Sequence, residues 1–139
     1  MNAALSTPAP KLRTGETLRV LVAEDDAATR RLLRQHLYRA GIEVLAAASG
    51  EEAIEICERE QAPIHLLLTD GIMPGIDGFE LARHVARRDP PMRAILLSGF
   101  LDHFMARTDI PENMEAFLAK PFVPQELIAR IMDAVSVTA

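Results

Sequence analysis

The sequence has few of the residues that stabilise small secreted proteins or mark membrane segments. Its 139 residues contain no tryptophan, one tyrosine and one cysteine, and aromatic residues make up only 4%. With Cys57 alone, no disulfide can form within the chain, which is typical of a reducing cytosol. No apolar run approaches the about 20 residues that a membrane-spanning helix needs. We therefore expect a cytoplasmic protein with an aliphatic core and no membrane association.

The chain also lacks an excess of basic residues, because its formal net charge is -5. Nucleic-acid binding normally requires a basic surface, so we do not expect a nucleic-acid partner. The length fits one domain. Residues 1–16 are small and polar and predict a flexible leader, which leaves residues 17–139 for the folded domain.

Short apolar segments alternate with segments of helical periodicity along the whole domain. The expected strands are residues 18–23, 43–47, 64–69, 93–98 and 115–119. The expected helices are residues 27–40, about 50–60, 79–88, 101–107 and 124–135. The strands are nearly continuous apolar runs, as in sheets that are covered on both faces. This pattern predicts an α/β fold, a doubly wound five-stranded parallel sheet with five helices.

Polar residues stand at the carboxyl ends of four of these strands. They are Glu24 with Asp25, Asp70, Ser98 and Lys120. The carboxyl ends of parallel strands lie at one edge of a sheet, which is where ligands bind in open α/β folds. Three clustered carboxylates repel one another, and a hard divalent cation with few protein ligands, Mg²⁺, relieves that repulsion.

A carboxylate in such a site can act as a nucleophile on phosphorus and form an aspartyl phosphate. Phosphoryl transfer mainly needs positioning and charge neutralisation, which the metal, Lys120 and Ser98 would supply around Asp70. Each residue alone has a simpler interpretation: the acids after the first strand favour a helix N-terminus, and Asp70 before a glycine favours a turn. The coincidence of four strand ends supports the catalytic interpretation.

Four motifs occur in an order that resembles the receiver domain of two-component response regulators, from about Leu18 to Val135. They are VLVAEDD (residues 20–26), LLLTDGIMPGIDG (66–78), AILLSG (94–99) and FLAKPF (117–122). The resemblance implies a flavodoxin-like sheet with strand order 2-1-3-4-5. It also implies a phosphoacceptor signalling domain, not an enzyme acting on a separate substrate.

The same resemblance implies a Mg²⁺ site and a phosphorylation site. Asp70 matches the phosphoacceptor. Asp25 and Asp70 match direct metal ligands, Glu24 matches an acid that acts through a metal-bound water, and Ile72 would offer its backbone carbonyl.

Further residues match the switch of the family. Ser98 matches the switch hydroxyl and Lys120 the lysine that pairs with the phosphoryl group. The Lys120–Pro121 bond matches a peptide bond that is cis in the family. Phe117 matches the aromatic switch position but has no hydroxyl, which excludes a switch that works through a hydrogen bond from that ring.

The resemblance implies partners as well. A histidine kinase or a histidine phosphotransfer protein would donate the phosphoryl group in a phosphorelay, and the output would be binding to a downstream protein partner or a phosphorylation-linked homodimer. We expect the output face at the fourth helix, fifth strand and fifth helix. The exposed arginines Arg30, Arg31 and Arg34 could dock a partner or simply face solvent.

Two features depart from the family pattern. Residues 107–114 (RTDIPENM) replace the usual small residues before the last strand, which leaves the length of the fourth helix open. Ile72 and Phe100 are apolar where many relatives are polar. We hypothesise that they hinder attacking water and lengthen the life of the phosphoaspartate.

Three alternatives remain at this point. The chain could be a receiver cut from a hybrid histidine kinase, or an unphosphorylated pseudo-receiver that acts only as a binding module. It could also be a Mg²⁺-dependent phosphohydrolase with an aspartyl nucleophile, although no general acid is evident near Asp70.

Overall fold

The computed structural model describes residues 11–12, 14–135 and 137–138, so most of the expected leader lies outside the described residues. The strands are β1 (Lys11–Leu12), β2 (Arg19–Ala23), β3 (Glu43–Ala47), β4 (Leu66–Asp70), β5 (Arg93–Ser98), β6 (Met114–Ala119) and β7 (Val137–Thr138). The helices are α1 (Ala27–Arg39), α2 (Gly50–Arg59), α3 (Gly78–Ala86), α4 (Leu101–Met105) and α5 (Pro124–Val135). None of the described helices is long and apolar enough to cross a membrane.

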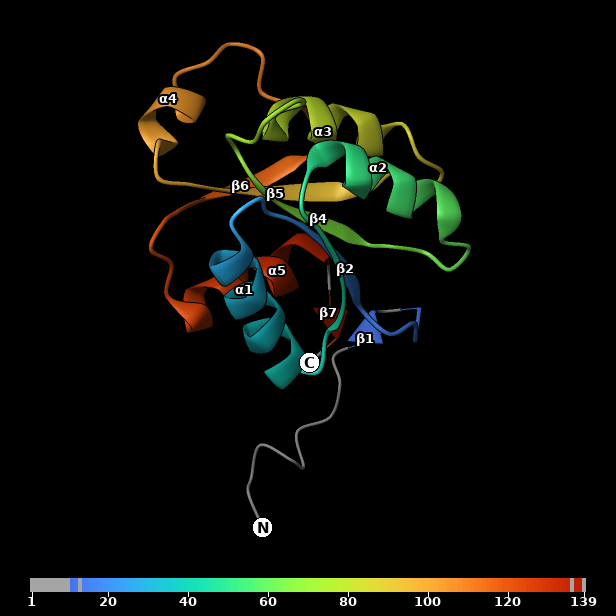
Figure 1. The fold of residues 1–139 in the computed structure, drawn as a ribbon. Helices are drawn as coiled ribbons and strands as arrows, with labels where there is room; N and C mark the ends of the chain where they lie inside the picture. Colours follow the sequence, from blue (N-terminus) through green and yellow to red (C-terminus); the bar gives the residue numbers. More distant parts are fainter. Residues whose placement is uncertain (1–10, 13, 136, 139) are drawn as a thin grey trace.

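Five strands form one parallel sheet in the order β3-β2-β4-β5-β6, which confirms the expected order 2-1-3-4-5 when these five strands are counted alone. Helices α1 and α5 cover one face of the sheet, and α2 and α3 cover the other (Figure 1). Helix α4 lies near the β6 edge of the sheet. The doubly wound fold therefore places the carboxyl ends of all five strands at one edge.

Alternation along the strands divides the core into two layers. Val20 and Val22 belong to the cluster that packs under α1 and α5, whereas Leu21 and Ala23 belong to the cluster under α2 and α3. All four are fully buried, because successive side chains of a strand point to opposite faces and both faces are covered.

Side-chain caps set the start of three helices. Asp26 accepts a hydrogen bond from the Thr29 amide at the start of α1, and Asp77 does the same for the Glu80 amide in α3. Ser49 caps α2 by accepting from the Glu52 amide. Asp26 is thus a helix cap beside the acidic cluster, whereas Glu24 and Asp25 remain for the site.

The structure differs from the prediction at some element ends and in one added pairing. Strand β4 begins at Leu66 and not at residue 64, and α3 ends at Ala86 and not at residue 88. Helix α4 ends at Met105 and not at residue 107. The chain then turns so that Arg107 reaches Asp77 and Asp109, and Pro111 prevents the helix from resuming. In addition, Lys11–Leu12 pairs antiparallel with Val137–Thr138 in a small separate ribbon that no pattern in the sequence indicates.

Candidate functional site

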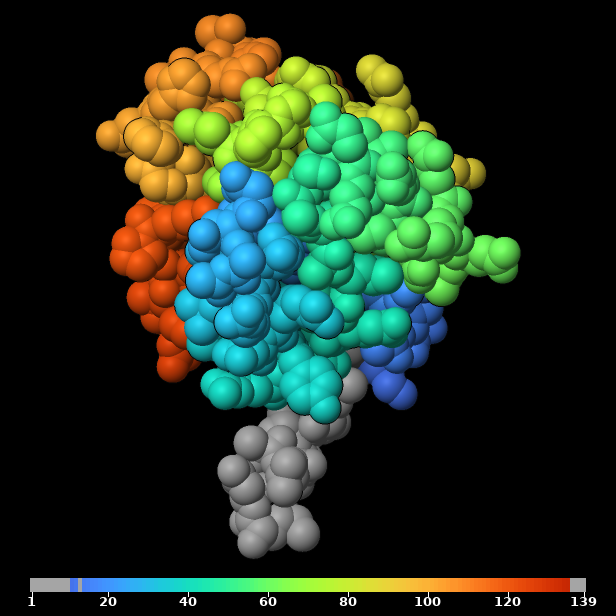
Figure 2. All heavy atoms as spheres, in the orientation of Figure 1, coloured from blue at the N-terminus to red at the C-terminus, as the bar shows by residue number. Residues whose placement is uncertain are grey.

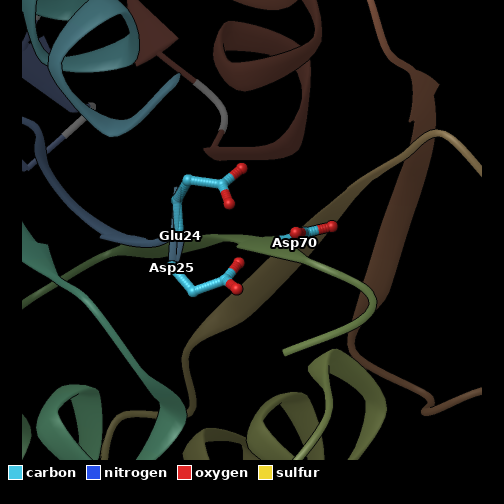
Figure 3. Close-up of side chains that lie close together, drawn as sticks. All are labelled: Glu24, Asp25 and Asp70. Carbon is cyan, nitrogen blue, oxygen red and sulfur yellow. The ribbon is translucent and has the colours of Figure 1, made fainter. Parts of the chain in front are cut away.

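Three carboxylates meet at the carboxyl edge of the sheet. Glu24 and Asp25 directly follow β2, and Asp70 is the last residue of β4, the neighbouring strand. One carboxylate oxygen from each lies within 4.8 Å of the others. Figure 3 shows the side chains extending to the same side from the ends of these two strands. The fold thus joins acids that are 45 residues apart in the sequence.

Glu24 is the buried member of this cluster, with only 1% of its surface exposed. Its carboxylate accepts hydrogen bonds from the Asp26 amide at 3.1 Å and from Lys120 Nζ at 2.5 Å. Burial raises the pKa of Glu24, and the nearby Asp70 adds to that rise, although the two hydrogen bonds oppose it. Burial therefore makes the negative charge of Glu24 costly in free energy.

Lys120 is a cation at this site, and it directly follows β6, the outermost strand on the other side of β4 and β5. Its Nζ lies 2.5 Å from Glu24 Oε1 and 3.2 Å from Asp70 Oδ2. Burial alone lowers the pKa of Lys120, but its contacts with Glu24 and Asp70 outweigh burial and raise it. The lysine is therefore protonated at neutral pH and links the buried acid to the expected phosphoacceptor.

Ser98 ends β5, the strand that pairs with β4. It is 1% exposed, and its Oγ accepts a hydrogen bond of 2.9 Å from the Phe100 amide, directly before α4. Its carbonyl accepts from the Lys120 amide at 3.0 Å. Ser98 therefore contacts both the segment that carries the lysine and the segment that enters α4. The Lys120–Pro121 peptide bond is cis, as the resemblance predicts.

The loop after Asp70 folds back on the strand end. The Gly71 carbonyl accepts from the Gly78 amide at 2.8 Å, and Gly75 has a φ of +84°, a conformation that favours glycine. A Cβ at Gly78 would lie 2.5 Å from the Asp70 carbonyl, so glycine permits this close approach. The side chain of Ile72 is 51% exposed, and its predicted metal-binding carbonyl belongs to this loop.

Two residues that sequence reasoning did not assign to the site contact it. The Arg30 guanidinium, expected to point away, donates to the Glu24 carbonyl at 2.8 Å and so supports the turn that carries the acids. The ring of Phe104 in α4 lies against Gly71, where a Cβ would be 2.4 Å from its Cε2 atom. The absence of a side chain directly after Asp70 was the available signal for this second contact.

The residues present fit a magnesium ion. Glu24, Asp25 and Asp70 supply hard oxygen ligands, and few protein ligands leave room for water and a phosphoryl oxygen, as Mg²⁺ prefers. The burial of Glu24 and the rise of its pKa are the marks of a site that gains stability when a cation neutralises it.

Comparison with known proteins gives one consistent family. The family model of the response regulator receiver domain matches residues 20–132. Among curated proteins, the response regulator receiver protein CpdR of Brucella abortus is 38% identical over 114 residues, which are 81% of this chain and 92% of that protein. The transcriptional regulatory protein AfsQ1 of Streptomyces coelicolor is 38% identical over 112 residues, 81% of this chain and 48% of that protein. The chain thus spans about half the length of several of these relatives.

Solved structures agree with the sequence comparisons. A response regulator receiver domain protein from Clostridium thermocellum superposes with a TM-score of 0.77 at 28% identity and covers 86% of this chain and 94% of its own. The response regulator TrrA from Thermotoga maritima, solved in complex with Mg²⁺-BeF, gives a TM-score of 0.75 at 27% identity over 85% of this chain and 99% of its own. The likeness extends over nearly all of the domain.

Proposed function

The chain belongs to the response regulator receiver domain family, and on that premise we propose that Asp70 accepts a phosphoryl group from a histidine kinase or a histidine phosphotransfer protein. The observation that carries the proposal is the contact of one lysine with two acids: Lys120 Nζ lies within 3.2 Å of Asp70 and within 2.5 Å of Glu24. Residues 17–139 would form the receiver domain, acting in a cytoplasmic phosphorelay.

The transfer is a displacement at phosphorus. A carboxylate oxygen of Asp70 forms the new P–O bond while the P–N bond to the donor histidine breaks. The electron pair of that bond leaves with the imidazole nitrogen, which takes up a proton from solvent. Lys120 is placed to pair with a phosphoryl oxygen once Asp70 carries the group, because its ammonium already contacts that carboxylate.

Mg²⁺ is the cofactor that we propose for this transfer. Glu24, Asp25 and Asp70 would hold it, and the Ile72 carbonyl is the expected backbone ligand. When bound, the ion would neutralise charge on the transferring phosphoryl group. Glu24, which already pairs with Lys120, would then interact with a second cation.

The output would begin at Ser98. Its Oγ now accepts a hydrogen bond from the Phe100 amide at the entry to α4. Attraction of the hydroxyl to a phosphoryl oxygen on Asp70 would weaken that bond and release the start of α4. The face formed by α4, β6 and α5 would then change its contacts with a downstream protein or with a second copy of the chain.

Incubation with acetyl phosphate and Mg²⁺ tests this function, with intact mass as the readout. We expect one alkali-labile phosphoryl adduct on the wild type and none on Asp70→Asn. Asp109→Asn, an exposed acid outside the cluster, is the matched control and should be modified like the wild type. Continuous release of phosphate without an adduct would indicate the phosphohydrolase, and no adduct on the wild type would indicate the pseudo-receiver.

The lifetime of the phosphoaspartate tests a finer proposal. Ile72 is 51% exposed and Phe100 is 65% exposed, and they lie two residues after Asp70 and Ser98, respectively. We propose that these apolar side chains restrict attacking water. Replacing both with asparagine should therefore shorten the half-life severalfold, on the order of 1 kcal/mol in the barrier. Ile110→Asn, at a residue that is 40% exposed and lies in a different loop, should leave the half-life unchanged.

A further inference from the structure

Strand β3 forms a free edge of the parallel sheet. It stands at the end of the strand order and pairs only with β2 among the described residues. The Glu43 amide donates to the Leu18 carbonyl, and the Ala47 carbonyl accepts from the Glu24 amide, so residues of this parity face β2. The backbone amide and carbonyl groups of the intervening residues, Val44 and Ala46, therefore point outward from the free edge, in the plane of the sheet.

Protection of this edge is limited to one charged residue at its start, Glu43. The strand sequence is Glu-Val-Leu-Ala-Ala, with neither lysine nor proline, and Val44, Leu45 and Ala46 are each partly exposed. An exposed apolar edge with free amide and carbonyl groups is a template for pairing with another extended segment. The outward groups of Val44 and Ala46 are thus available to a partner backbone.

A groove of about 750 Å³ runs between this edge and α1. Val44 and Glu43 line its strand side, and arginines with Tyr38 line its helix side. Figure 2 looks onto this face, where α1 in cyan lies at the surface beside the teal segment that follows it. Tyr38 is 80% exposed, which leaves a large aromatic surface without cover in the described part of the chain.

The helix side of the groove is strongly basic. Helix α1 has four arginines and no acid, although the whole chain carries a net charge of -5. Arg30 is engaged with the Glu24 carbonyl. Arg31 and Arg34 are exposed and make no ion pair with any described residue. Two unpaired guanidinium groups beside a free strand edge favour an acidic occupant.

We propose that the groove between α1 and β3 binds an extended acidic segment of a partner protein by β-strand addition. The segment pairs its backbone with Val44 and Ala46. Because side chains alternate along a strand, acids at every second position face α1 and meet Arg31 and Arg34.

This surface is separate from the phosphorylation site and needs no phosphoryl group on Asp70. Backbone pairing distinguishes it from a helix laid on α1, which would use the arginines but leave the outward amides of β3 in water. An added strand therefore needs the backbone amide of Ala46, whereas a helix on α1 does not, and this difference can be measured. The test needs no phosphodonor, so it fails or succeeds independently of the function proposed above.

The test uses a fluorescein-labelled peptide of four Glu-Val repeats, with binding to the full chain followed by anisotropy. Arg31→Glu combined with Arg34→Glu should weaken binding about tenfold or more. Arg87→Glu, at an exposed arginine directly after α3, is the control and should bind like the wild type. A peptide of four Lys-Val repeats should not bind, and equal binding of both peptides would overturn the proposal.

Backbone pairing is tested at Ala46. Ala46→Pro removes an outward amide without removing a bond to β2, and it should abolish binding, whereas Ala46→Val should retain it. In the wild type, saturating peptide should slow amide hydrogen exchange about tenfold at Val44 and Ala46 but not at Leu45. Unchanged exchange at both residues would overturn strand addition. It would do so even if the charge reversal at Arg31 and Arg34 weakened binding.

Discussion

The two sides of the functional site are packed with different side chains. Beside β2 and β4 the core is aliphatic, and Leu21, Leu67 and Leu68 are fully buried there. Beside β5 and α4 the core is a small aromatic cluster in which Phe79 and Phe104 meet edge to face, with ring centroids 5.2 Å apart. The first region holds the acids, and the second lies under the helix that follows Ser98.

Helix α4 has one buried side chain, Phe104, and the residues directly after the helix add a few surface contacts. Phe104 packs on Gly71, and the Arg107 guanidinium lies 4.6 Å from the centroid of the Phe79 ring while it pairs with Asp77 and Asp109. Contacts between a five-residue helix and its surroundings can be exchanged at a small cost in free energy. The difference suggests a fixed cluster of acids beside an adjustable output element.

Truncation of a buried side chain in the aliphatic core beside β2 and β4 should have the largest effect on the free energy of unfolding. Leu67→Ala removes a fully buried side chain from the central strand β4 and should lower the free energy of unfolding by about 2–5 kcal/mol. Leu101→Ala, at a partly exposed residue that packs against the buried aromatic cluster, should cost about 1 kcal/mol. Urea unfolding of both variants gives the comparison. Equal losses would contradict a difference in rigidity between the two regions.

Mg²⁺ should stabilise the folded chain by binding to the three clustered carboxylates. At a concentration of 100 times its dissociation constant, the ion should raise the free energy of unfolding by about 2.7 kcal/mol, because only the folded chain assembles the three carboxylates. Thermal unfolding with and without the metal measures this gain. Asp25→Asn should lose most of it, whereas Asp102→Asn, at an exposed acid of α4, should retain it.

Crowding of the contact between Phe104 of α4 and Gly71, which follows Asp70, should have an intermediate effect on the free energy of unfolding. A Cβ at Gly71 would lie 2.4 Å from the Phe104 ring, so Gly71→Ala should cost about 1–3 kcal/mol and displace α4. Gly99→Ala is the matched control, because nothing lies within 4 Å of its added Cβ. Faster amide exchange in α4 of the Gly71 variant alone would support this contact, and equal exchange in both variants would refute it.

The Arg107–Asp109 pair should give the smallest effect, and it depends on pH. Its hydrogen bonds from Arg107 hold the pKa of Asp109 below the usual 3.8. Because the pKa of Asp109 is lower in the folded state, the pair stabilises the fold at pH values above the pKa of the unfolded state. That stability is lost as the pH falls through the pKa of the folded state. The difference in stability between wild type and Asp109→Asn should therefore vanish in strong acid. A constant difference at all pH values would exclude this pair as its source.

The positions of the site residues could be predicted because each depends on a strand and on what ends it. The apolar runs before Glu24, Asp70 and Ser98 predict buried parallel strands, and parallel strands bring their carboxyl ends together whatever lies between them in the sequence. Lys120 was placed in the same way, by the end of the last strand. These inferences need only local periodicity and the geometry of a parallel sheet.

Other contacts depend on distances that no local pattern encodes. The stacking of Phe104 on Gly71 joins residues from different elements, and the length of α4 follows from where Arg107 finds its partners. The pairing of Lys11–Leu12 with Val137–Thr138 likewise depends on where the two ends of the domain lie after folding. Such contacts are decided by side-chain packing between elements, which alternation and helical periodicity do not specify.

The amino-acid sequence by itself determined the parallel sheet, its helices and the edge at which acids, hydroxyl and lysine meet, because hydrophobic periodicity specifies elements and their buried faces. Only the tertiary structure decided that Glu24 is buried against Lys120, that Arg30 supports the acidic turn and that the edge of β3 opens onto unpaired arginines. Burial, pairing and exposure are properties of the assembled surfaces, and they arise only when elements distant in the chain come within a few ångströms.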